Sequence, residues 1–198
     1  MAAIEDELWA EIVKDYFAMA DGVLFTGGLA YPPSLYGEKP HATVQEQSQE
    51  RTGADFKLME LARPSQKPSL GICAGLQLLN IETGGGLIQH LDTAKDHVRA
   101  AQNDSSHPVE LLPGTQLADL FGSRHLTVNS AHHQAANPAR LGRELKVSAL
   151  APDGTIEALE LERQDGRFFV FVQRHPERLA DAEHRRKLFS AFIDASRR

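Results

Sequence analysis

Apolar residues near both ends of the chain recur with the period of a helix. In "IEDELWAEIVKDYF" (residues 4–17) they return every three or four positions among Glu and Lys, which predicts an amphipathic helix. Near the other end, Leu188, Phe189, Phe192 and Ile193 fall on one face of a second predicted helix.

Short apolar runs between these helices predict buried strands. They are "GVLFTGG" (22–28), "KPSLGIC" (67–73), "RFFVFVQ" (167–173) and the pair within "ELKVSALAPDGTIEALEL" (144–161), which an Asp-Gly turn divides. "LTVNSAHHQAAN" (126–137) is typical of a strand that runs into a loop. "AGLQLLNIETGGG" (74–86) predicts a helix that its glycines stop, and "TQLADLFG" (115–122) a shorter one.

A long polar segment with three prolines, residues 29–56, predicts a loop that leads into a helix at Asp55 to Ala62. Loops of this length are usually functional or mobile. Strand and helix signals otherwise alternate without a repeat or linker, so we expect one α/β domain over residues 1–198.

Composition excludes several classes of protein. The net charge is −6 and the 21 basic residues are scattered, which argues against a nucleic-acid partner. The single cysteine allows no internal disulfide, and no apolar segment reaches the roughly 20 residues that cross a bilayer. The acidic start does not resemble a signal peptide. We therefore expect a cytoplasmic protein without a membrane association.

The cysteine, Cys73, has two readings. From composition alone a buried core thiol is favoured, since free Cys is among the most buried residue types. Its position between a predicted strand and a predicted helix favours a nucleophile instead, because the first helical N–H groups and the helix dipole stabilise a thiolate. Gly71 and Gly75 flank it, which permits a sharp turn and close approach of a substrate, although ordinary turn chemistry explains them equally well.

A thiol nucleophile also needs a base and a group that orients the base. "VQRHPE" presents His175 where a predicted strand ends, and Pro176 stops that strand so that Glu177 can turn back toward the imidazole. The alternative is a surface histidine followed by the first residue of the last helix. Backbone N–H groups of "FTGG" (25–28) and of Ala74 could bind an oxyanion.

The sequence predicts no metal site and no cofactor. His132 and His133 are adjacent, so in an extended segment they point to opposite faces, and no carboxylate or Cys has a matching spacing around them. His90, His97 and His107 follow no pattern. The Gly84 to Gly86 run follows a helix instead of opening one, which favours a helix stop over a phosphate site.

Together these segments resemble the class I glutamine amidotransferase-like hydrolases, specifically the peptidase C26 branch that includes γ-glutamyl-γ-aminobutyrate hydrolase. The resemblance extends from Asp21 onward and rests on "TGG" (26–28), "PSLYGE" (33–38), "GICAGLQLLN" (71–80), "NSAHHQ" (129–134), "APDGTIEALE" (151–160) and "VQRHPE" (172–177). It implies a flavodoxin-like sheet flanked by helices, with the site at the strand ends.

The resemblance also implies roles for individual residues. Cys73 would be the nucleophile, His175 the base and later acid, and Glu177 the group that orients it. The reaction would form a thioester from a small γ-glutamyl amide, as in polyamine catabolism, without a cofactor. The oxyanion donors would be Gly28 and Ala74. The γ-glutamyl pocket would be lined by Gly27, Gln77, Asn129, Ser130, His132 and His133.

Three departures from the family pattern bear on the substrate and the fold. Ala74 stands where the family often has Arg, and Arg174 where it usually has Trp. Strand alternation would direct Arg174 to the face opposite that of Gln173 and His175. If the alternation breaks at the strand end, Arg174 could reach the pocket rim and pair with an acidic leaving amine. Family members normally begin with a further strand, helix and strand, which are absent from this sequence. The strands "GVLFTG" and "PSLGIC" should therefore lack neighbours. We expect an upstream start or, less favoured, completion of the sheet by a second copy in a homodimer.

Two other functions stay open. A glutaminase subunit would use the same three residues and pass ammonia to a synthase partner. A binding protein on the same fold would keep the residues without turnover.

Overall fold

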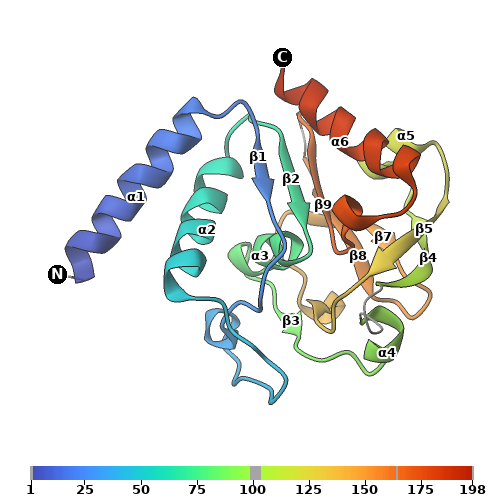
Figure 1. The fold of residues 1–198 in the computed structure, drawn as a ribbon, viewed down its shortest axis with the longest axis horizontal. Coiled ribbons are helices and arrows are strands. Elements are labelled where there is room, and N and C mark those ends of the chain that lie inside the picture. The colour runs from blue at the N-terminus through green and yellow to red at the C-terminus, as the bar shows by residue number, and fades with distance from the viewer. Residues whose placement is uncertain (1, 99–103, 164, 198) are drawn as a thin grey trace.

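The computed structural model describes residues 2–98, 104–163 and 165–197, and these ranges contain one seven-stranded mixed sheet (Figure 1). Its order is β1-β2-β9-β8-β7-β4-β5. The strands are β1 (Val23–Phe25), β2 (Ser69–Ile72), β4 (Ser105–Leu111), β5 (His125–Ser130), β7 (Leu145–Leu150), β8 (Ile156–Leu161) and β9 (Phe169–Val172). The first three in the order are parallel, and the remaining neighbours pair antiparallel. A separate antiparallel ribbon joins β3 (Leu87–Ile88) and β6 (Ala135–Ala136).

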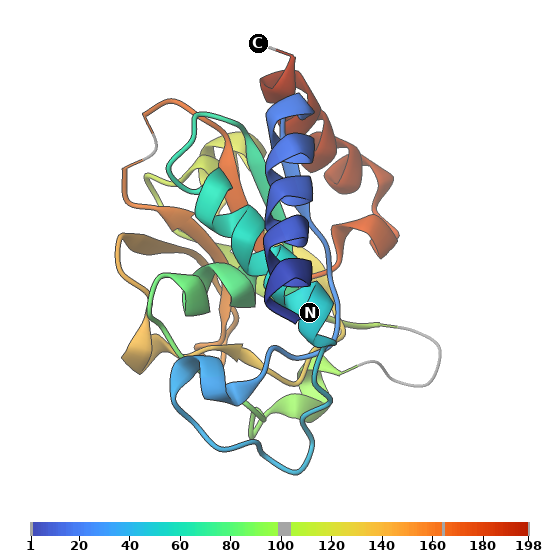
Figure 2. The ribbon, with the colours of Figure 1, turned by 90° about the vertical axis from the view of Figure 1, so that its left-hand side faces the viewer.

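Helices cover both faces of the sheet (Figures 1 and 2). One face packs against α2 (Gln49–Ala62) and α3 (Ala74–Glu82), and α1 (Ala2–Met19) packs on α2. The other face packs against α5 (Gln116–Phe121) and α6 (Ala182–Ser196). The short α4 (Ala94–His97) lies beside β4, and 3-10 turns occupy Pro33–Tyr36, Pro138–Arg140 and Pro176–Arg178. The hydrophobic core is therefore divided by the sheet into two layers.

The expected helices and strands are present, with one boundary moved. The helix expected from Asp55 begins at Gln49, because the Ser48 hydroxyl accepts a hydrogen bond from the Arg51 N–H and caps the helix earlier. The strands on either side of the Asp-Gly turn pair with each other as predicted. The sequence pattern did not predict this cap, because the residues around it are polar and show no apolar period.

The expectation that "PSLGIC" lacks neighbours is wrong. Its strand, β2, pairs with β1 on one side and β9 on the other, so its backbone groups are satisfied. β1 is an edge strand in the described sheet, with β2 as its partner. No helix in the described ranges is both long enough and apolar enough to cross a membrane.

The parallel part of the sheet determines where the chemistry lies. Since β1, β2 and β9 run in the same direction, their carboxyl ends meet at one edge. Gly27 follows β1, Cys73 follows β2 and His175 follows β9. Ligands of open α/β sheets bind outside this edge.

Candidate active site

Cys73 occupies a strained turn between β2 and α3. Its φ of 50° and ψ of −101° lie outside the regions that L-residues usually adopt, as expected at a nucleophile elbow. The helix can start so close to the sheet because Gly75 has no side chain: a Cβ there would lie 2.7 Å from the Phe25 carbonyl oxygen. The thiol is thus held beside the N-terminus of α3, whose first N–H groups have no intrahelical partner.

The strain at Cys73 gives a stability prediction that is independent of catalysis. Glycine adopts this backbone conformation readily, whereas alanine does not, so Cys73→Gly should be more stable than Cys73→Ala by about 1 kcal/mol. Denaturant unfolding of the two variants measures the difference. The matched control is Ala118→Gly in α5, where helical geometry should reverse the sign. Equal unfolding free energies of the two Cys73 variants would contradict the strained turn.

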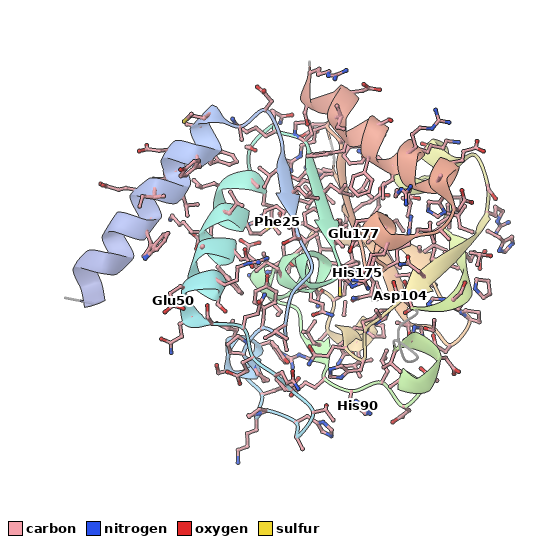
Figure 3. The ribbon with its side chains drawn as sticks, viewed as in Figure 1. Phe25, Glu50, His90, Asp104, His175 and Glu177 are labelled. Atoms are coloured by element: carbon pink, nitrogen blue, oxygen red, sulfur yellow. The ribbon has the colours of Figure 1, made fainter. Side chains whose placement is uncertain are left out.

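His175 and Glu177 lie together where β9 ends (Figure 3). The imidazole Nδ1 and the Glu177 Oε1 are 2.7 Å apart, and the His175 side chain also hydrogen-bonds Cys73. The 3-10 turn Pro176–Arg178 bends the chain so that the carboxylate returns to the ring. The structure therefore joins the three residues that the sequence analysis singled out.

The charges of this group are coupled. Burial by itself lowers the pKa of His175, but its hydrogen bonds to Cys73 and Glu177 outweigh burial and raise that pKa to about 9. Burial raises the pKa of Glu177, and the hydrogen bond to His175 reverses this into a net lowering. At neutral pH the imidazole therefore holds a proton between a carboxylate and the thiol.

A clamp fixes the backbone of His175. The Asn129 amide donates to the His175 carbonyl oxygen at 2.8 Å and to Asp104 Oδ2 at 2.7 Å. Arg178 donates hydrogen bonds to the same Asp104 carboxylate, from Nε at 3.0 Å and from Nη2 at 3.1 Å. These contacts orient the segment that carries the imidazole.

The sequence analysis missed a chain of amides that leads to the sulfur. The Gln173 Nε2 donates to Cys73 Sγ at 3.5 Å, and its Oε1 accepts from Gln77 Nε2 at 3.4 Å. Gln77 also donates to the Gln134 carbonyl oxygen at 3.3 Å. Gln173 is part of "VQRHPE", but only the register of β9 beside β2 shows that it faces the thiol.

The glycines after β1 allow the backbone to approach the reacting groups. A Cβ at Gly27 would lie 2.9 Å from His175 Cε1 and 3.7 Å from Cys73 Cβ, so a side chain there would displace the imidazole. Gly28 lines the cavity together with Cys73. Ala74 is the first residue of α3, and the first N–H groups of a helix have no intrahelical partner. Gly28 and Ala74 thus stay the predicted oxyanion donors.

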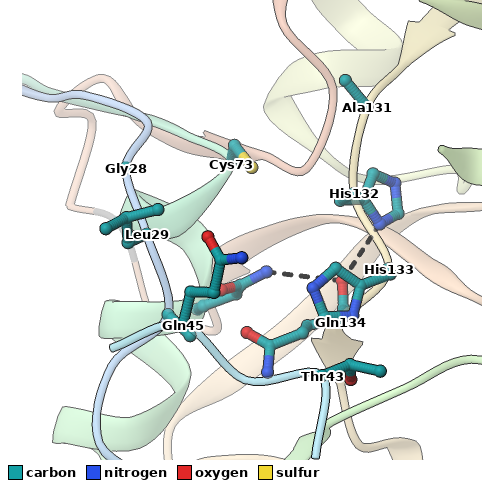
Figure 4. Close-up of a pocket in the computed structure, with 11 residues that line it drawn as sticks. Gly28, Leu29, Thr43, Gln45, Cys73, Ala131, His132, His133 and Gln134 are labelled. Carbon is teal, nitrogen blue, oxygen red and sulfur yellow. Dashed lines mark hydrogen bonds between the residues drawn. The ribbon is translucent and has the colours of Figure 1, made fainter. Parts of the chain in front are cut away.

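A cavity of about 350 Å³ opens beside the cysteine (Figure 4). Gln77, His132 and His133, which the resemblance assigned to the pocket, lie on its wall. The long loop after β1 and the segment after β5 provide lining residues that were not singled out: Leu29, Ala30, Thr43, Gln45, Ala131 and Gln134. The loop thus forms one side of the cavity.

Three residues assigned to the pocket are not among its lining residues: Gly27, which lies against His175, and Asn129 and Ser130. Asn129 belongs to the clamp on His175 described above, and Ser130 is fully buried with its hydroxyl donating to the His97 carbonyl oxygen at 3.0 Å. Both are in β5, whose end turns inward before the chain reaches the cavity at Ala131. The prediction that they line the pocket is therefore wrong.

Arg174 also lies away from the cavity. Its side chain is fully buried on the opposite face of the sheet, 3.1 Å from His184 Nε2 and over the Phe121 ring. Burial lowers its pKa to about 10, and burial followed by the Arg174 charge lowers the pKa of His184 to about 4. Strand alternation, which directs Gln173 toward the thiol, directs its neighbour away. The alternation expected of a strand therefore holds, and Arg174 does not reach the rim to pair with a leaving amine.

The structure collects histidines that had no pattern in the sequence. His97, His107 and His132 lie around Glu157, with one ligand atom of each within 4.8 Å of the others. The structure thus gives His132 the carboxylate neighbour that its sequence surroundings did not predict, because the four residues come from distant segments.

Comparison with known proteins places this geometry in a family. The peptidase C26 family matches residues 4–177. "Putative glutamine amidotransferase Rv2859c" of Mycobacterium tuberculosis is 38% identical over 177 residues, which are 88% of this chain and 55% of that protein. "Protein NtpR" of Enterococcus hirae is 38% identical over 82% of this chain and 69% of its own length. This chain thus spans about half of the mycobacterial relative.

A solved structure has the same fold. The glutaminase domain of Trypanosoma brucei CTPS, with bound acivicin, superposes with a TM-score of 0.66 over 94% of this chain and 74% of that one, at 17% identity. The α/β fold with a mixed sheet between helices is therefore that of glutaminase domains. On the match of its sequence, this chain belongs to the peptidase C26 family of glutamine amidotransferase-like hydrolases.

Proposed function

We propose that this protein hydrolyses the γ-glutamyl amide bond of a small molecule through a thioester on Cys73. The observation that carries the proposal is the series Cys73, His175 and Glu177, in which the imidazole interacts with both the thiol and the carboxylate and Cys73 lines the cavity. A nucleophile, a base and an orienting carboxylate in this order are the parts that acyl transfer requires.

Each group has a defined step. Cys73 Sγ attacks the γ-carbonyl carbon and forms a C–S bond, while the carbonyl electrons move to the oxygen near the N–H groups of Gly28 and Ala74. Collapse of this intermediate breaks the C–N bond, and the His175 imidazolium gives its proton to the departing amine. Neutral His175 then takes a proton from water, which attacks the thioester. Breaking of the C–S bond returns the thiolate and releases glutamate.

The cavity suits an amino-acid head group. Its volume of about 350 Å³ is at the lower end of ligand sites, which favours a small substrate. Gln45, Gln77 and Gln134 supply amide or carbonyl groups to its wall, and burial followed by the His90 charge lowers the pKa of His133, which keeps that ring neutral. These side chains offer both hydrogen-bond donors and hydrogen-bond acceptors, which suit a head group that carries an ammonium and a carboxylate. A γ-glutamyl-γ-aminobutyrate-like amide is the substrate we favour.

The alternative is a glutaminase subunit that passes ammonia to a synthase partner. The similarity to the glutaminase domain of CTPS supports it. A panel of L-glutamine and γ-glutamyl amides with acidic, neutral and basic amines, assayed for released glutamate, separates the two. We expect γ-glutamyl amides to be hydrolysed by the isolated chain with kcat/KM at least about tenfold above that for glutamine. Glutamine as the best substrate would support the subunit instead.

A binding protein without turnover is tested on the same samples. Acivicin, the compound bound in the CTPS structure, should add once to the wild-type chain and not to Cys73→Ser, as measured by intact mass. Cys73 is the one thiol, so the adduct reports on this site alone. An unreactive Cys73 together with no turnover of the panel would exclude the hydrolase.

A further inference from the structure

Four buried side chains that catalysis does not use converge beneath the cavity wall. His97 ends α4, His107 lies in β4, His132 follows β5, and Glu157 lies in β8. The Glu157 side chain has no exposure, and those of His97, His132 and His107 are 3%, 2% and 10% exposed. Buried ionisable groups are rare unless they are paired or bind a metal, so this group, the His97–Glu157 cluster, requires an explanation.

The spacing of the cluster fits a tetrahedral metal ion. Oε1 of Glu157 lies 3.6 Å from His97 Nδ1, 3.5 Å from His107 Nε2 and 3.4 Å from His132 Nε2. A tetrahedron with metal–ligand bonds of about 2.0–2.1 Å has edges of about 3.4 Å. The three distances from Glu157 to the histidines therefore nearly equal such an edge, and the distances between the histidine nitrogens are within 4.8 Å.

The second nitrogen of every histidine is already held. His97 Nε2 lies 2.9 Å from Asp153 Oδ2, His107 Nδ1 lies 3.1 Å from the Pro108 carbonyl oxygen, and His132 Nδ1 lies 3.0 Å from that of Gln134. Because these partners accept hydrogen bonds, they orient each ring with an N–H on its outer nitrogen. Metal-binding histidines characteristically have such partners.

Most of the inner atoms are left without donors, although His97 Nδ1 lies 3.5 Å from the Ser130 hydroxyl oxygen. Both carboxylate oxygens of Glu157, and Nε2 of His107 and His132, have no hydrogen-bond partner among the described residues. Unpaired ring nitrogens and carboxylate oxygens thus face one another in a buried space, where a cation between them would satisfy both.

We propose that His97, His107, His132 and Glu157 bind one divalent transition-metal ion, with Zn²⁺ as the preferred occupant. Three imidazoles and one carboxylate in a tetrahedral arrangement suit zinc better than Mg²⁺ or Ca²⁺, which prefer oxygen ligands and higher coordination. Four protein ligands leave no position for a substrate, so the ion is structural. It joins α4, β4 and the segment after β5 to β8 and fixes His132, which lines the cavity.

The test uses the full chain in a Cys73→Ser background, so that the thiol cannot bind the probe. After removal of metal by a chelator, calorimetric titration with Zn²⁺ should give one site per chain. Thermal unfolding should shift upward by about 10 °C when free Zn²⁺ exceeds Kd a thousandfold. Co²⁺ in place of Zn²⁺ should give the intense visible absorption of a tetrahedral site.

Glu157→Gln keeps the shape and removes the charge, so it should raise Kd at least about a hundredfold and abolish the thermal shift. Asp153→Asn, outside the ligand set, should weaken binding by about 10–100-fold and serves if Glu157→Gln does not fold. His90→Gln is the control, because it disrupts a more exposed contact among His41, His90 and His133. Absence of a 1:1 site, unchanged binding in a folded Glu157→Gln, or loss of binding in His90→Gln alone would overturn the proposal.

Discussion

Cys73→Ser should lose turnover of γ-glutamyl amides by about 10⁴–10⁶-fold and keep its fold. The replacement changes one atom in a turn whose geometry is set by Gly75 and the start of α3. A hydroxyl has a far higher pKa than a thiol, so the adjacent imidazole cannot supply the ionised nucleophile that the reaction needs. Steady-state kinetics measure the loss.

Intact mass after rapid quenching supplies the second measurement. Wild-type protein should carry a transient glutamyl adduct on its one thiol, and Cys73→Ser should carry none. Circular dichroism and thermal unfolding of the two proteins should coincide. Retained turnover in the serine variant would refute the thioester mechanism.

His175→Asn should reduce kcat/KM by about 10³–10⁴-fold. Glu177→Gln should have a kcat/KM about a hundredfold higher than that of His175→Asn. The imidazole transfers protons in both halves of the reaction, while the carboxylate acts through the imidazole at 2.7 Å. Arg124→Gln is the control, because it removes an exposed ion pair with Glu110 and leaves the three site residues unchanged. Equal rates in the His175 variant and wild type would return His175 to a surface role.

The pH profile distinguishes orientation from a merely structural effect of Glu177. The pKa of His175 is raised to about 9, so its proton should be available through neutral pH and lost as the pH rises through about 9. The hydrogen bond and charge of Glu177 stabilise the imidazolium, so Glu177→Gln must lower this pKa and move the alkaline fall in kcat/KM to lower pH. An unmoved alkaline limb would show that Glu177 does not act on the imidazole's charge.

The sequence by itself determined most of the helices and strands and singled out Cys73, His175 and Glu177, because those signals are local. It did not predict β4. The glycines around Cys73 and the turn at Pro176 lie within a few residues of the groups they position, and the apolar runs identify β2 and β9. Since those strands are parallel, their ends had to meet, which brings Cys73 to His175.

Only the tertiary structure decided which face each strand-end side chain occupies. A shift of one residue in register exchanges the two faces of a strand, and no local pattern fixes it at a polar strand end. For this reason the sequence does not show that Gln173 faces the thiol, and Asn129, which the resemblance assigns to the cavity, does not line it. The His97–Glu157 cluster shows the same limit most clearly. Its members come from four segments up to 60 residues apart, and the pairing of β4, β5, β7 and β8 is what brings their ring nitrogens to one carboxylate.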